Sequence, residues 1–228
     1  MKLYQYPSSP HCMKVRAVAY ELEIELEIAT VNLFERDRDR CELETLNPNG
    51  LVPVLVDGDF VLWESNAILT YLAGTRRSPA LVPTDVRGRA DVERWLHWQS
   101  AHLGPAISRV AFERFIVPMT GQAPVDPAAG ARAANDFEAH CRVLEGSLRD
   151  VEYIADRLSV ADFALACMLN GAAMVGLGID GFPRTRAWLR RMVARESMRR
   201  AVTDARLSVS ELFPCGTGPG KKDRRRTR

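Results

Sequence analysis

Apolar and polar residues follow two patterns that alternate over the first 80 residues of the chain. Short apolar runs typical of strands are separated by segments with helical spacing of the apolar positions, as at Val15, Val18, Ala19 and Leu22. The predicted order is strand, helix, strand, helix, strand, strand, helix. The strands are expected over 2–6, 27–31, 52–56 and 60–63, and the helices over 12–22, 36–46 and 67–73.

The connections between these segments predict how the strands pair. Two strands joined by a helix are expected to be parallel, with a right-handed crossover. Asp57-Gly58-Asp59 indicates a tight hairpin turn, which adds an antiparallel edge. The helix over 36–46 is expected to stop before Asn47-Pro48-Asn49-Gly50, because a residue that precedes proline avoids the helical region.

Beyond residue 85 the pattern is helical throughout. Helices are expected over 91–115, with a bend near Gly104-Pro105, and over 128–148, 159–175, 185–194 and 198–205. The fold class is therefore an α/β N-terminal domain followed by an all-α C-terminal domain. The expected boundaries are 1–75 for the first domain, 76–85 for a linker, 86–207 for the helical domain and 208–228 for a basic, disordered tail.

The net charge of +2 is a property of the tail. Residues 221–228 hold six cations and one anion, and removing them from the 31 cations and 29 anions leaves 25 cations and 28 anions. A basic end can contact nucleic acid by counterion release, but such ends are more often simply solvated, so no nucleic-acid partner is expected. No apolar run approaches the ~18–20 residues of a membrane span, and no membrane association is expected.

Cysteine usage indicates the compartment. The five cysteines are an odd number and include no CxxC pair, which argues against a disulfide framework and against a structural metal site. The first residues also lack the apolar stretch of a signal peptide. A reducing cytoplasm is the expected location.

The turn Ser8-Ser9-Pro10 is the first candidate for chemistry. Ser9 suits a helix N-cap and Pro10 suits the first helical position. A serine without a neighbouring base is a poor nucleophile, so its hydroxyl is expected to act as a hydrogen-bond donor. Two interpretations remain open: Ser9 only caps the helix, or it faces the cleft at the carboxyl ends of the strands and stabilises an anion such as a thiolate.

Two further segments have features of a binding site. Pro53 inside an apolar strand belongs at an edge or an irregular start, where a cis bond is possible, and the backbone of Val52 is then free to pair with an extended peptide. Ser65, at a helix start, offers donors to a carboxylate, while Glu64 offers the opposite charge to an ammonium group. An ordinary edge strand and a simple cap are the structural alternatives. Ser159 and Asp162 have capping-box spacing and are interpreted as a folding signal.

Taken together in this order, these segments resemble the soluble glutathione S-transferase family over residues 1–206. The most specific parts are 47–55, Asn-Pro-Asn-Gly-Leu-Val-Pro-Val-Leu, and 64–68, Glu-Ser-Asn-Ala-Ile. The resemblance, to serine-type, bacterial-like members, implies a thioredoxin-like N-terminal domain and a helical C-terminal domain. It also implies glutathione as cosubstrate, a homodimer and a role in detoxification.

The resemblance also implies roles for individual residues. Ser9 falls where serine-type members keep the hydroxyl that supports the glutathione thiolate. The backbone of Val52 falls where the cysteinyl part of glutathione pairs, and Pro53 falls at the cis-proline. Glu64 and Ser65 fall where the γ-glutamyl group is held.

Other residues follow from the same resemblance. Arg38, with Arg40, lies in the helix region that often contacts the glycine carboxylate. The electrophile is expected against the long first helix of the C-terminal domain, with Ile107, Phe112 and Phe115 as lining residues. Each of these three could equally be ordinary helix core or surface.

Two departures from the family pattern keep alternatives open. Many members carry glutamine where this chain has Leu51. Cys12 lies three residues past Ser9, and a thiol in the first turn of a helix can have a lowered pKa. The expected activity is transfer of glutathione to a small hydrophobic electrophile. The alternatives are thiol–disulfide exchange through Cys12, a glutathione-dependent isomerisation, and a non-catalytic module whose tail recruits an anionic partner.

Overall fold

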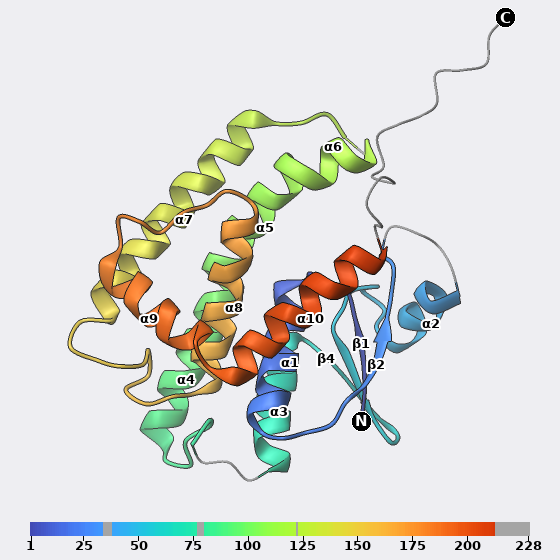
Figure 1. Ribbon diagram of the computed structural model, residues 1–228, viewed down its shortest axis with the longest axis horizontal. Coiled ribbons are helices and arrows are strands. Elements are labelled where there is room, and N and C mark those ends of the chain that lie inside the picture. The colour runs from blue at the N-terminus through green and yellow to red at the C-terminus, as the bar shows by residue number, and fades with distance from the viewer. Residues whose placement is uncertain (34–37, 77–79, 122, 213–228) are drawn as a thin grey trace, which may run out of the picture.

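The computed structural model has a small mixed sheet on one side and a group of long helices on the other (Figure 1). It describes residues 1–33, 38–76, 80–121 and 123–212. The strands are β1 (Lys2–Gln5), β2 (Glu27–Thr30), β3 (Val54–Asp57) and β4 (Phe60–Trp63).

The strand order in the sheet is β2-β1-β3-β4. β1 is parallel to β2 and antiparallel to β3, and β3 and β4 form the antiparallel hairpin that Asp57-Gly58-Asp59 predicts. The strand expected over 52–56 begins only at Val54, because Pro53 has no N–H with which to continue the ladder. The predicted thioredoxin-like arrangement is confirmed.

Three helices accompany the sheet: α1 (Pro10–Glu21), α2 (Arg38–Leu46) and α3 (Ser65–Thr75). α2 ends before the Asn47–Gly50 loop, as predicted.

The second half is helical in all its described residues apart from connecting loops and one isolated bridge. It contains α4 (Val86–Trp98), η1 (Gln99–Leu103), α5 (Gly104–Ala111), η2 (Phe112–Ile116), α6 (Val117–Thr120), α7 (Pro127–Ser147), α8 (Val160–Met174), α9 (Pro183–Val193) and α10 (Glu196–Leu212).

The predicted bend near Gly104-Pro105 is a π-helical turn. η1 and η2 interrupt the long helical stretch from α4 to α6, and each lies just before a proline, Pro105 or Pro118. A proline in a helix lacks the N–H and its ring crowds the carbonyl four residues earlier, and the wider π turn relieves both problems. Gly104 must be small, because a Cβ there would lie 2.9 Å from the Gln99 carbonyl oxygen.

The expected domain boundaries fall in loops or near helix ends. α3 ends at Thr75 and α4 begins at Val86, on either side of the expected linker over 76–85. α10 continues to Leu212, past the domain end expected at 207, and residues 213–228 of the expected tail lie outside the described residues. Of the helices that are described, none combines the length and the apolar character needed to cross a bilayer.

Asp162 organises the start of α8 and its neighbours. Its carboxylate is fully buried and accepts hydrogen bonds from the backbone N–H of Ile154 (3.0 Å) and Ser159 (2.9 Å) and from the indole Nε1 of Trp188 (2.9 Å). Burial raises the pKa of this carboxyl, and these hydrogen bonds oppose the rise. The sequence motif is thus a folding signal, as predicted, and it also ties α9 to α8.

We expect Asp162→Ala to lower the free energy of unfolding by about 3–5 kcal/mol, because it leaves several buried donors without an acceptor. Chemical denaturation followed by circular dichroism measures this change. Asp136→Ala, at an exposed position of α7, is the matched control and should leave the free energy of unfolding unchanged within about 0.5 kcal/mol. Equal effects of the two substitutions would contradict the role given to Asp162.

Candidate functional site

The hydroxyl of Ser9 is not used to cap α1. Ser9 is the N-cap residue, with φ −65° and ψ 123°, and its carbonyl oxygen accepts from the N–H of Met13 (2.9 Å) and Cys12 (3.0 Å). Its side chain makes no capping hydrogen bond to a backbone N–H of the helix. The interpretation of Ser9 as only a side-chain cap is therefore wrong, and the hydroxyl lies at the positive end of a 12-residue helix.

Cys12 is buried against the interior, with no exposed surface. Burial raises the pKa of its thiol, although hydrogen bonds from the Tyr6 backbone and the Ser9 hydroxyl oppose the rise. The expectation that the start of a helix lowers this pKa is wrong, because desolvation outweighs the helix dipole and these hydrogen bonds. Cys12 is a protonated thiol at neutral pH and is inaccessible to a substrate.

A cleft of about 130 Å³ lies beside this turn and brings together several predicted residues. It is lined by His11, Asn47, Asn49, Leu51, Val52, Pro53, Glu64 and Ser65. The Val52–Pro53 bond is cis, and the β1–β3 pairing ends at Tyr4 and Val54, so that the backbone of Val52 lies beyond the paired residues. An extended peptide backbone can therefore pair with Val52 in this cleft.

Glu64 and Ser65 stand at the junction of β4 and α3. Glu64 has φ 71° and ψ 105°, a conformation that costs a non-glycine residue of order 1–3 kcal/mol and that clusters at ligand sites. Its exposed carboxylate faces solvent, whereas Ser65, the first residue of α3, is only 7% exposed. A negative group thus lies next to the positive end of α3, which suits a ligand that carries an ammonium and a carboxylate.

His11 is a member of the cleft to which sequence reasoning gave no role. Its Nδ1 lies 3.3 Å from the Ser65 hydroxyl, which joins the start of α1 to the start of α3. Burial, together with the charge of Lys14, lowers the pKa of His11 to about 4, so the imidazole is neutral at physiological pH. In the sequence, only the position of His11 two residues after Ser9 connected it with this site. That spacing does not distinguish a residue of the cleft from one on the surface.

The Asn47–Gly50 loop shapes the opposite wall of the cleft. The buried Asn47 donates from Nδ2 to the Leu51 carbonyl (2.8 Å) and accepts from the Asn49 N–H (3.0 Å). Gly50, with φ 61°, lies close to the Arg40 guanidinium, since a Cβ there would be 3.0 Å from Nη2. Leu51 is 61% exposed at the cleft and offers no polar side-chain group to a ligand.

The remaining predicted residues are not among those that line the cleft. The backbone of Arg38 begins α2, but its side chain lies outside the described part of the chain. Ile107 is 4% exposed and belongs to the core, so it offers little surface to an electrophile. Phe112 is half-buried with the Arg109 guanidinium 5.9 Å from its ring, and Phe115 is 49% exposed; both stay predictions.

A second cavity, of about 400 Å³, borders the same turn and was not predicted. It is lined by Ser8, Met13, Asn170, Ala173, Met174, Val202 and Ala205, from the turn, α1, α8 and α10. Ser8 lines this cavity and His11 lines the cleft, so the turn that carries Ser9 borders both. The lining is mainly apolar, with one hydroxyl and one amide.

Comparison with known proteins agrees with this geometry. Residues 1–74 match the glutathione S-transferase N-terminal domain, and residues 127–191 match the glutathione S-transferase C-terminal domain. Glutathione S-transferase 3 of Zea mays is 33% identical over 89% of this chain and 93% of its own length. Glutathione S-transferase GstB of Escherichia coli K12 is 30% identical over 86% of this chain and 94% of its own length.

Solved structures show the same fold. The glutathione transferase URE2P8 of Phanerochaete chrysosporium, solved with oxidized glutathione, superposes with a TM-score of 0.82 at 25% identity, over 92% of this chain and 96% of that one. The sequence matches extend over both halves of the chain, and the start of α1, the cis-proline loop and the start of α3 line one cleft. The chain belongs to the glutathione S-transferase family.

Proposed function

We propose that the protein transfers glutathione to an electrophilic carbon of a small hydrophobic molecule. The observation that carries this proposal is the Ser9 hydroxyl, which does not cap the helix and belongs to the N-cap residue of α1, between Ser8, which lines the apolar cavity, and His11, which lines the cleft. The glutathione transferases to which the chain is similar support the same chemistry.

The cleft offers a partner to most parts of glutathione. The backbone of Val52 pairs with the cysteinyl residue beside Pro53, in the manner of an added strand. The α-carboxylate of the γ-glutamyl group meets Ser65 and the positive end of α3, and its ammonium meets Glu64. Arg38 is proposed to contact the glycine carboxylate.

The energy needed to ionise the thiol is within reach of these groups. A free thiol has a pKa of ~8.5, and lowering it by ~2 units requires about 2.7 kcal/mol of preferential stabilisation of the thiolate. One charge-assisted hydrogen bond supplies roughly 1.5–3 kcal/mol, and a helix dipole adds up to ~1–2 kcal/mol. Ser9 at the start of α1 is therefore sufficient.

Cys12 takes no direct part in this account, because burial keeps its thiol protonated and out of reach of a substrate. The proton of the ligand's thiol is released to solvent as the thiolate forms. The thiolate then attacks the electrophile held in the cavity beside Ser8, forming the new S–C bond while the leaving group departs with its electron pair. Asn170, which donates only a long 3.8 Å contact to the Met13 sulfur, is free to bind an acceptor on the electrophile.

We expect Ser9→Ala to lower kcat for the conjugation of glutathione to chlorodinitrobenzene about 10–100-fold, the equivalent of one lost charge-assisted hydrogen bond. The ultraviolet absorbance of the bound thiolate should show its pKa returning toward that of free glutathione. Cys12→Ala is the matched control and should retain most of the activity. Full activity in Ser9→Ala together with inactivity in Cys12→Ala would show that the cysteine mechanism is the right one.

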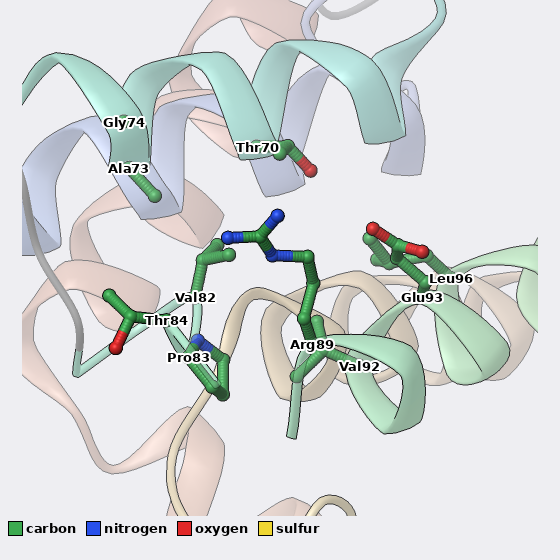
Figure 2. Close-up of a pocket in the computed structure, with 10 residues that line it drawn as sticks. All are labelled: Thr70, Ala73, Gly74, Val82, Pro83, Thr84, Arg89, Val92, Glu93 and Leu96. Carbon is green, nitrogen blue, oxygen red and sulfur yellow. The ribbon is translucent and has the colours of Figure 1, made fainter. Parts of the chain in front are cut away.

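We also propose that two copies of the chain associate through α3 and α4. A cleft of about 480 Å³ between these helices has a mainly apolar lining that includes Ala73, Val92 and Leu96. Figure 2 shows the Arg89 guanidinium reaching across it toward Thr70.

The charges at this cleft favour a second copy of the chain. Arg89 and Glu93 form no ion pair with any residue that the structure describes, although both are charged and border apolar surface. In a twofold arrangement Arg89 of each protomer can meet Glu93 of the other, because such an interface is self-complementary. The proposed occupant of the cleft is therefore the same face of a second protomer.

Charge reversal tests the dimer. We expect Arg89→Glu and Glu93→Arg each to raise the dimer dissociation constant about tenfold or more, and the double variant to restore association, because the swapped charges again face their opposites. Sedimentation velocity measures the dissociation constant. Arg87→Glu, on α4 but outside the cleft lining, controls for the change in net charge. A monomeric wild type, or equal effects at positions 87 and 89, would exclude this interface.

We also propose a domain division and a location for the protein. The loop between α3 and α4 supports a glutathione-binding domain over 1–75 and a helical domain from residue 86. Cys12, Cys41, Cys141 and Cys167 are free thiols, which suits a cytoplasmic protein.

A further inference from the structure

Lys14 is a lysine in the protein interior, on α1, with partners at the start of α3 and in η1. Its side chain has no exposed surface, and Nζ donates to Asn66 Oδ1 at 2.5 Å and to Gln99 Oε1 at 2.8 Å. Both partners are neutral amides, and among the described residues no carboxylate forms an ion pair with it. A buried lysine without a carboxylate partner is rare, because its charge must be stabilised in some other way.

The partners of Lys14 connect it to the glutathione cleft. Asn66 directly follows Ser65, and its Nδ2 donates to the Leu96 carbonyl at 2.8 Å and to the Ser100 hydroxyl at 2.9 Å. The side chain of Asn66 therefore fastens the start of α3 to the end of α4, with Lys14 on its acceptor oxygen. Fixed support of this kind keeps the groups that contact a ligand in the productive geometry.

We propose that Lys14 is a positioning residue of the glutathione site, whose buried ammonium holds Asn66 in place and supplies positive charge behind Ser65 for the α-carboxylate of the γ-glutamyl group. This inference rests on the proposed function. It explains why a lysine occupies a buried position that a neutral side chain would fill more easily. The negative partner of Lys14 is then the α-carboxylate of the bound ligand.

The charge on Lys14 changes near neutral pH. Burial lowers the pKa of Lys14 to about 7, and the carboxylate of Glu64 at the start of α3 opposes the fall. The thiols of Cys167 on α8 and Cys12 on α1 also lie near Lys14, but burial raises the pKa of each and keeps them uncharged near neutral pH. The nearby His11 has a pKa of about 4 and stays neutral in this range. A carboxylate bound beside Ser65 favours the ammonium form, so binding takes up a proton and weakens as the pH rises through about 7.

S-methylglutathione is the probe, because it has no thiol whose own proton would complicate the measurement. We expect Lys14→Met to raise its dissociation constant about tenfold at about pH 6, where the wild-type lysine is charged. Calorimetry in buffers of different ionisation enthalpy should show proton uptake on binding to the wild type and less uptake on binding to Lys14→Met. Lys14→Arg should keep the affinity and lose this part of the uptake, because arginine does not deprotonate.

Lys2→Met is the matched control, since Lys2 lies at the start of β1 in a long, partly exposed ion pair with Glu27. Binding to Lys14→Met with unchanged affinity and unchanged proton uptake would overturn the role of Lys14 and leave the proposed function intact. Failure of the wild type to bind S-methylglutathione would overturn the proposed function itself.

A readout on the wild type alone covers the case in which Lys14→Met does not fold. The chain has only four lysines, Lys2, Lys14, Lys221 and Lys222, so the Cε resonance of each can be followed by nuclear magnetic resonance in lysine-labelled protein. We expect one resonance to titrate near pH 7 and to move to higher pH when S-methylglutathione binds. A set of four resonances that all titrate above about pH 9.5, as exposed lysines do, would contradict the pH dependence, and four resonances that all stay in place when S-methylglutathione binds would contradict the proposal.

Discussion

The burial of α1 on nearly all sides is the constraint on which the rest of the structure depends. Every residue from Cys12 to Ala19 is buried, and the helix packs against α3, α8 and α10. At its start Pro10 packs so closely on α8 that a Cβ at Gly171 would lie 2.5 Å from the proline ring. The N-terminus of α1 is thereby fixed at the junction of sheet and helical domain. The turn that carries Ser9 and the first residues of α1 border two cavities, one proposed to hold the peptide and the other proposed to hold the electrophile.

Because α1 has no solvent-facing side, its polar residues must be satisfied inside the protein. Arg16 donates to the carbonyl oxygens of Pro7 (3.0 Å) and Ala201 (3.3 Å) and to the side chain of Gln5, and so ties β1 and α10 to the same helix. Lys14 does the same toward α3 and η1 through neutral amides. Buried cations matched with neutral oxygens rather than carboxylates leave a positive potential around the start of α1, where an anionic ligand is proposed to bind.

The sequence predicts the elements better than it predicts what surrounds them. Asp57-Gly58-Asp59 and Asn47-Pro48-Asn49-Gly50 specify local backbone conformations, so the hairpin and the end of α2 could be read directly. The burial of Lys14 could not be predicted from the sequence, because charged residues on a helix normally face solvent and no local pattern indicates that another domain covers them. Ile107 shows the same limit: it was expected to line the electrophile pocket but is buried in the core. Helical spacing alone does not indicate which stripe of a helix faces a ligand and which faces the core.

Packing, rather than the residues present in the turn, separates the two candidate residues at the start of α1. Ser9 and Cys12 both lie near the start of α1, and the helix dipole favours an anion at either one. Cys12 has no exposed surface, so desolvation raises the pKa of its thiol and keeps it protonated, while Ser9 one turn earlier keeps partial access to solvent. A cysteine that is not ionised at neutral pH and cannot reach a substrate does not act as a nucleophile, so the proposed chemistry falls to the serine hydroxyl.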